Sequence, residues 1–120
     1  MSEPQLQGVL TRWARFLPIS PETPRITLGE GDTPLVRSVS IERECGLDEL
    51  WLKLESSNPT GSFKDRGMVV AVAKSLEAGS QAIMCASTGN TSASAAAYGA
   101  RYGLRTLVMV PKSDVTIGKL

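Results

Sequence analysis

The spacing of apolar residues predicts three strands after residue 48. The stretch ELWLKLE (49–55) alternates apolar and polar positions, which is typical of a half-buried strand. The runs QAIMCA (81–86) and RTLVMV (105–110) are short and mostly apolar, as expected of strands buried on both faces. Pro111 follows the last run and favours its end there.

Two helices are predicted between these strands. The segment 65–78 is long enough for a helix and is followed by Gly79, a residue type common just past a helix end. The alanine-rich segment 92–103 predicts the second helix. Strands that alternate with helices indicate an α/β fold, with an open parallel sheet and helices on both faces in three layers. Binding is then expected at the carboxyl ends of the strands.

The first 37 residues have a different character. They contain five of the seven prolines and the segment RITLGEGDTPLV (25–36), which together favour an irregular arm with one short edge strand. We therefore divide the chain into an arm, residues 1–37, that wraps around the core, and an α/β domain, residues 38–120.

The last residues, KSDVTIGKL (112–120), predict the beginning of a helix. Ser113 or Asp114 is a suitable helix cap, and Val115, Ile117 and Leu120 follow at roughly helical spacing. A sheet with an unfinished last helix would leave apolar surface uncovered. We expect the domain to be incomplete at its carboxyl end and these residues to form the amino-terminal part of a longer enzyme.

Composition and charge exclude several classes of function. Thirteen basic and twelve acidic residues give a net charge of +1, which does not favour binding to nucleic acid or to a membrane surface. The chain has no histidine, and Cys45 and Cys85 lie far apart, so neither a metal site nor a serine–histidine nucleophile is expected. The amino terminus resembles no signal peptide, and we predict a cytoplasmic protein with reduced thiols.

The loop NPTGSFKDRG (58–67) places a lysine at the predicted start of a helix. Ser62 and Asp65 have the spacing of a capping box, so Lys64 would stand in the first helical turn. A cation there faces the positive end of the helix dipole, at a cost of up to about 1 kcal/mol. An uncharged amine avoids this cost, and it is the form that acts as a nucleophile or carries an aldehyde cofactor. Taken alone, however, a lysine near a helix start is most often a solvated side chain.

A second loop, STGNT (87–91), follows the strand at 81–86 and opens a helix. Its hydroxyl, amide and backbone N–H groups would converge where an anion is favoured. A simple helix cap with a tight turn explains the same residues equally well. Both loops follow strands of the predicted sheet, so we expect them to meet at one edge.

The two loops together resemble a known family. NPTGSFKDRGM, followed after one helix and one strand by CASTGNTSASAAAYGA, is similar to the threonine synthases of the tryptophan-synthase-β-like, fold-type II pyridoxal-phosphate enzymes. The arm motif GDTPLV also resembles this group, so the similarity extends from about Arg25 to the last residue.

The resemblance implies roles for individual residues. Lys64 would bind pyridoxal phosphate covalently and later move protons at the substrate's carbons, and Asn90 would contact the cofactor's 3-hydroxyl group. Phe63 would line the cofactor pocket, although a plain core position is the simpler interpretation. We expect Asp65 and Arg66 to serve as a cap and an ion-pair scaffold. The α-carboxylate of the substrate would bind Ser87, Thr88 and Thr91.

The implied reaction converts O-phosphohomoserine and water into threonine and phosphate, in a homodimeric enzyme. Threonine and serine dehydratases of the same family share the sequence pattern around the lysine. The combination of STGNT and KDRGM in this chain favours the synthase. A non-catalytic truncated module that docks on an intact enzyme is a further alternative. No candidate for the family's phosphate-binding glycine loop, or for the hydroxyl group that faces the pyridine nitrogen, occurs here, so we expect these 120 residues alone to be inactive.

Overall fold

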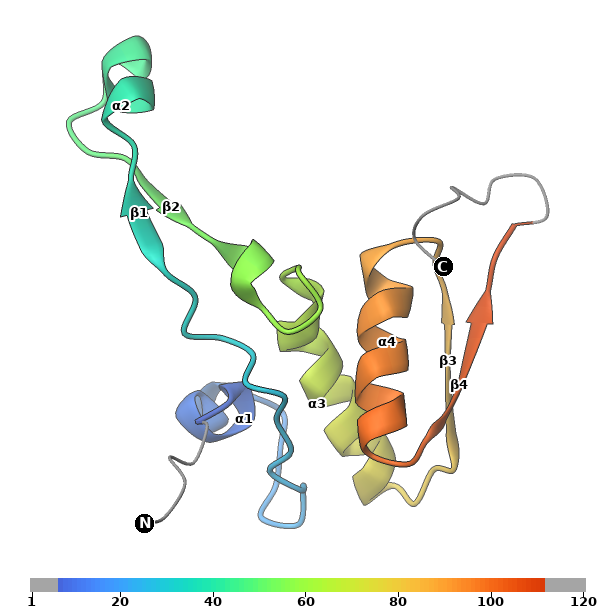
Figure 1. Cartoon of the computed structure of the whole chain (residues 1–120). Coiled ribbons are helices and arrows are strands. Elements are labelled where there is room, and N and C mark those ends of the chain that lie inside the picture. The colour runs from blue at the N-terminus through green and yellow to red at the C-terminus, as the bar shows by residue number, and fades with distance from the viewer. Residues whose placement is uncertain (1–6, 112–120) are drawn as a thin grey trace, which may run out of the picture.

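The computed structural model describes residues 7–111 and shows a mixed helix and strand architecture (Figure 1). In chain order the elements are α1 (Val9–Arg12), η1 (Ala14–Phe16), β1 (Leu35–Arg37), α2 (Val39–Cys45), β2 (Trp51–Lys53), η2 (Glu55–Ser57), α3 (Lys64–Glu77), β3 (Ala82–Ala86), α4 (Asn90–Arg101) and β4 (Arg105–Met109). The helix predicted near residue 113 lies outside the described residues.

The strands β3 and β4 form a parallel pair joined by the crossover helix α4. Their register runs from Ala82 opposite Arg105 to Ala86 opposite Met109. A parallel connection needs a crossover, and the alanine-rich α4 provides it. The predicted α/β class with a parallel sheet is therefore confirmed.

The strand predicted at 49–55 is shorter and belongs to a different sheet. Its central part, β2, pairs antiparallel with β1, with Val36 opposite Leu52. The prediction that it is the first strand of the parallel sheet was wrong for the described residues. The 13 residues between β1 and β2 include α2 and return the chain antiparallel beside β1, and the spacing of apolar residues does not specify which strand pairs with which. All three residues of β2 are exposed, so the expectation of a half-buried strand was also wrong for the described residues.

The predicted helices both form, with shifted ends. Helix α3 begins one residue before the predicted segment and ends before Gly79, which adopts the left-handed conformation at φ 71°. Helix α4 begins at Asn90, two residues earlier than predicted. Helix boundaries depend on local caps and are expected to vary by this much.

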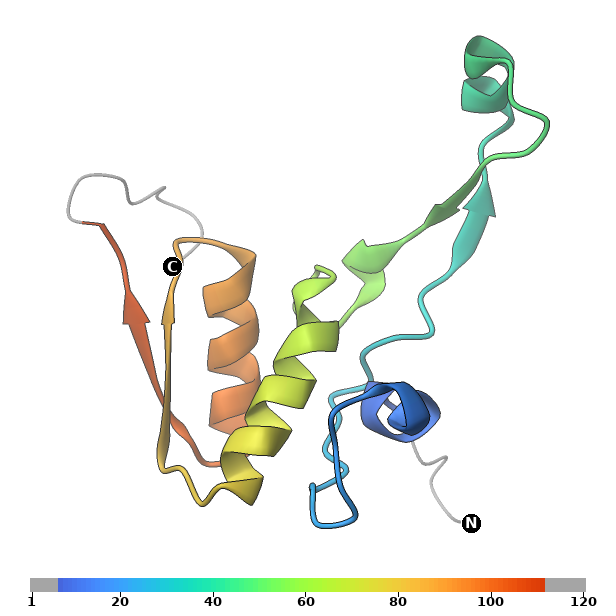
Figure 2. The same ribbon diagram turned by 180° about the vertical axis from the view of Figure 1, so that it is seen from behind.

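Both helices lie on the same side of the β3–β4 pair in the two opposite views (Figure 1, Figure 2). The Thr106 hydroxyl donates to the Ala95 carbonyl of α4, at 3.4 Å, so Thr106 faces this helix. Its neighbour Leu107 and the paired Met84 point to the opposite face and are 58% and 64% exposed. Among the described residues, no helix covers that face, so the expectation that these strands are buried on both faces is not met there.

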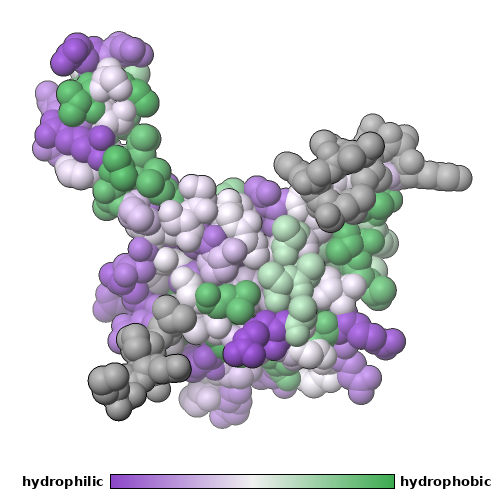
Figure 3. Space-filling model, viewed as in Figure 1, coloured by the Kyte–Doolittle hydropathy of each residue, from purple (hydrophilic) through white to green (hydrophobic). Residues whose placement is uncertain are grey.

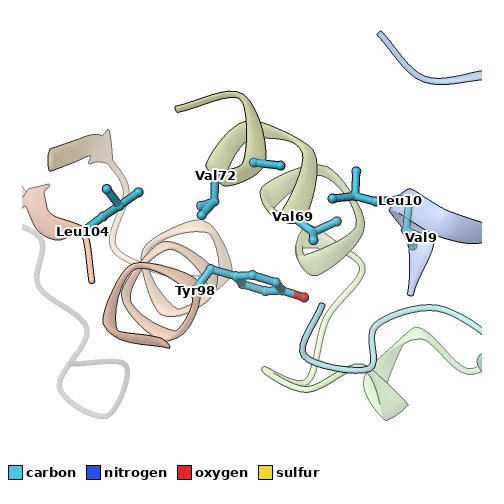
Figure 4. Packing of buried hydrophobic residues seen from close by; sticks show 7 residues of the cluster. Val9, Leu10, Val69, Val72, Tyr98 and Leu104 are labelled. Atoms are coloured by element: carbon cyan, nitrogen blue, oxygen red, sulfur yellow. The ribbon is translucent and has the colours of Figure 1, made fainter. Parts of the chain in front are cut away.

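The core lies between α1, α3 and α4 (Figure 4). Its buried members are Val9, Leu10, Val69, Val72, Ala73, Tyr98 and Leu104. Val9 and Leu10 come from the arm, so the expectation that the arm only wraps around the core was wrong. One buried carboxylate, Glu30, strengthens this attachment by accepting hydrogen bonds from the Val9 N–H, at 3.0 Å, and the Tyr98 hydroxyl, at 2.7 Å. The arm is thus tied to α4 through both apolar and polar contacts.

The segment from β1 to β2 projects from the remainder of the molecule and carries apolar surface (Figure 3). Its exposed apolar side chains include Leu35, Val36, Trp51 and Leu52.

None of the helices within residues 7–111 has the length and apolar character needed to cross a membrane.

Candidate active site

Lys64 is the first residue of α3 and its side chain is exposed. Its Nζ lies 5.1 Å from the centre of the Phe63 ring. Phe63 itself is 58% exposed, so the interpretation of this residue as plain core was wrong. Within residues 7–111, no ion pair involves Lys64. An aldehyde cofactor needs an accessible primary amine, and the position of Lys64 meets this requirement.

The cap in front of α3 differs from the predicted capping box. The Lys64 N–H donates to Ser62 Oγ at 3.3 Å, but Phe63 occupies the N-cap position and its side chain makes no cap hydrogen bond. Asp65 turns back to the loop, where the Thr60 N–H donates to its Oδ2 at 2.7 Å. The helix begins at Lys64, so Asp65 is its second residue and stands too early for the capping box that the spacing of Ser62 and Asp65 predicts.

The loop after β3 is held by one hydrogen bond to β4 and by another within the loop. The Ser87 N–H donates to the Met109 carbonyl at 3.2 Å, which extends the pairing of β3 with β4 by one residue. The Gly89 N–H donates to Ser87 Oγ at 3.1 Å, and Gly89 then occupies the N-cap position of α4. Among residues 7–111, no side chain caps this helix. The first N–H groups of α4, at Asn90 and Thr91, therefore remain available to an anion.

The two loops lie toward the same end of the molecule, but the first follows β2 of the other sheet, so the prediction that both follow strands of one sheet was wrong for the described residues. The amino-terminal ends of α3 and α4 lie at the end of the fold that also holds the carboxyl ends of β3 and β4 (Figure 1, Figure 2). A direct contact joins the two helices there, since the Ser94 hydroxyl donates to Asp65 Oδ1 at 2.5 Å. Lys64 thus lies beside the residue that ties α3 to α4.

An ion pair under the first loop supports its shape. Arg66 donates to both carboxylate oxygens of Glu55, at 2.7 and 2.8 Å, which confirms Arg66 as an ion-pair scaffold. This guanidinium lowers the pKa of Glu55 to about 2. Asn58 donates to Glu55 Oε2 at 2.9 Å and accepts from the Gly31 N–H, also at 2.9 Å. The loop is therefore joined to the GDTP segment of the arm, a contact that the spacing of these residues gave no means to predict.

The described residues contain no group of three or more histidine, cysteine or acidic side chains that could hold a metal ion. Cys45 and Cys85 are both free thiols.

Comparison with known proteins identifies the family. Residues 26–120 match the sequence model of the family described as "Pyridoxal-phosphate dependent enzyme". The chain belongs to this family. The resemblance carried by the two loops is therefore confirmed, and pyridoxal phosphate is the cofactor on which the family depends.

Curated relatives agree with this family assignment. A threonine synthase of Halalkalibacterium halodurans is 56% identical over 116 residues, which cover 97% of this chain and 32% of the relative. A threonine synthase of Bacillus sp. is 53% identical over 114 residues, or 95% and 32% of the two chains. A threonine synthase of Synechocystis sp. is 50% identical over 115 residues, or 95% and 30%. The chain therefore spans about a third of the length of these relatives.

Proposed function

We propose that the protein is a pyridoxal-phosphate-dependent threonine synthase, which converts O-phosphohomoserine and water into threonine and phosphate. The observation that supports this most strongly is the similarity to threonine synthases, at 50–56% identity, across both loops of the candidate site. Neither loop alone would distinguish this reaction from others of the family.

Lys64 is the residue that we propose to hold the cofactor. Its amine is exposed at the start of α3 and has no ion-pair partner within residues 7–111. When bound, the cofactor supplies an electron sink for the substrate's carbons. The free Lys64 amine would accept and return protons at those carbons, since a neutral lysine is a competent base.

Ser87, Thr88 and Thr91 would hold the substrate's α-carboxylate. The uncapped N–H groups at the start of α4 are donors of the kind that a carboxylate needs. Asn90, at the first position of α4, would donate to the cofactor's 3-hydroxyl group. Phe63 would offer an apolar surface to the cofactor ring, consistent with its large exposed fraction.

Two further features remain part of the proposal. The enzyme would act as a homodimer, and it would work in the cytoplasm, where its free thiols Cys45 and Cys85 remain reduced.

Two assays on the whole protein test the reaction. With O-phosphohomoserine, we expect phosphate release at a rate that falls at least about 1,000-fold in Lys64→Ala, because no other described residue supplies an amine at this position. Keto-acid formation from threonine, without phosphate release from O-phosphohomoserine, would instead identify a dehydratase. The absence of both activities, together with binding to an intact synthase, would favour the non-catalytic module.

A further inference from the structure

Asp65 is a buried carboxylate with an unusual set of partners. Its side chain is fully buried, and both oxygens accept hydrogen bonds. Oδ2 accepts from the Thr60 N–H at 2.7 Å, and Oδ1 accepts from the Thr60 and Ser94 hydroxyls, each at 2.5 Å. No cation pairs with it among the described residues. Three neutral donors and the start of α3 therefore balance this charge.

The position of Ser94 in α4 determines which face of this helix turns toward α3. Ser94 lies four residues after Asn90 in α4, so the two side chains occupy the same face of the helix, one turn apart. The contact between Ser94 and Asp65 therefore turns the face that carries Asn90 toward the start of α3. Lys64 immediately precedes Asp65 and lies in the same first turn of α3.

Helix packing alone gives no reason for a carboxylate at this place. Apolar side chains of similar volume usually join two helices at lower cost than a buried charge. A hydrogen-bonded carboxylate fixes distance and direction more strictly than apolar contact does. The loop residue Thr60 is fixed by the same group, so one side chain orders the loop before Lys64, the start of α3 and the face of α4.

We propose that Asp65 is a positioning residue that, through Thr60 and Ser94, sets the placement of Lys64 relative to Asn90 for cofactor attachment. This inference rests on the proposed function. It adds that the cross-helix contact, rather than Lys64 and Asn90 alone, determines how readily the cofactor attaches.

Cofactor attachment, measured without any turnover, tests the inference. The whole protein is titrated with pyridoxal phosphate, reduced with borohydride, and analysed by mass spectrometry for cofactor fixed on Lys64. We expect Asp65→Asn, Ser94→Ala and Thr60→Val to need at least about 10-fold more cofactor for half-maximal attachment, because a misplaced amine loses reactivity steeply. Thr60→Ser keeps the hydroxyl and the N–H and should attach cofactor as the native protein does.

Stability measurements separate positioning from a general loss of structure. Each variant is tested at a temperature well below its own melting temperature, so that only folded protein is compared. Ser75→Ala is the matched control, because the Ser75 hydroxyl donates to the Ala71 carbonyl within α3 and, among the described residues, makes no hydrogen bond to α4. Asp65→Asn removes a buried acceptor, and if it does not fold, Ser94→Ala and Thr60→Val decide the result.

The outcomes distinguish the two proposals. If the native protein fixes no cofactor on Lys64, the proposed function fails. If the native protein does so and folded Ser94→Ala and Thr60→Val match it at every cofactor concentration, only the positioning role is overturned. Weaker cofactor attachment in Ser94→Ala and Thr60→Val, with native attachment in Thr60→Ser and Ser75→Ala, supports the positioning role of Asp65.

Discussion

Arg66 and Glu55 show how single residues order the loop that precedes Lys64. Arg66 contacts both oxygens of Glu55, and the Thr33 hydroxyl donates to the same carboxylate at 2.8 Å. Hydrogen bonding from the guanidinium is the main reason that the pKa of Glu55 falls from its ordinary value of 4.5 to about 2. Because the unfolded chain binds a proton more readily here than the folded protein, acid favours unfolding.

The sign of this shift gives a prediction about pH. Glu55 contributes its full stabilisation above pH 4.5 and loses it as the pH falls toward 2. The unfolding free energy of the native protein should therefore decrease across this interval, and Glu55→Gln should decrease less steeply. Urea unfolding of the cofactor-free protein at a series of pH values measures both slopes.

Arg66→Met provides the matched variant for this experiment. This variant keeps Glu55 but lacks the guanidinium that lowers the pKa of Glu55. The slope of its unfolding free energy against pH should therefore also be shallower than that of the native protein. Equal slopes in the three proteins would contradict the assignment of this effect to the Arg66–Glu55 pair.

At the scale of elements, the sequence predicted local structure better than strand pairing. Helix α3 ends before Gly79, which adopts the conformation that glycine permits most easily, and this signal was visible in the sequence. The pairing of β1 with β2 was not predicted, because spacing shows which face of a strand is apolar but not which strand lies beside it. The alternating pattern of residues 49–55 could have suggested an antiparallel partner.

Glycine positions in α3 and α4 give a prediction at the same scale. A Cβ at Gly99 would lie 2.0 Å from Thr106 Oγ1 and 3.2 Å from the Leu104 carbonyl oxygen, so α4 approaches β4 too closely for a side chain there. We expect Gly99→Ala to destabilise the protein by about 1–3 kcal/mol.

Gly67 in α3 is the control, because a Cβ there meets no atom of residues 7–111 within 4 Å beyond its own helix backbone and chain neighbours. Gly67→Ala should stabilise the cofactor-free protein by about 0.5–1 kcal/mol, since alanine loses less conformational freedom in a helix. Chemical denaturation measures both variants. A stable Gly99→Ala protein would show that the packing of α4 on β4 is looser than the structure indicates.

At the scale of the whole molecule, the fold brings two loops that are distant in sequence to one end. Lys64 and the 87–91 loop could be selected from the sequence, because turn residues, a lysine and hydroxyl groups follow predicted strands. The contact between Asp65 and Ser94 could not be predicted, since the two residues are 29 positions apart and no local pattern joins them. The exposed position of Lys64 agrees with the interpretation of a solvated lysine near a helix start, and the uncharged state of its amine stays a prediction.

The relatives extend well beyond the part that matches this chain, which spans about a third of their length. The described residues supply an amine and an uncapped helix start, and they leave apolar side chains exposed on the β1–β2 segment and on one face of β3 and β4. The proposed activity is therefore a property of the whole protein, and its tests are designed for that protein.

The location of the cofactor's attachment tests the central claim most directly. The whole protein is loaded with pyridoxal phosphate, treated with borohydride, digested and sequenced by mass spectrometry. The account predicts one modified peptide, with the added mass on Lys64, and its absence in Lys64→Ala. Modification of another lysine in the native protein, with Lys64 unmodified, would contradict it.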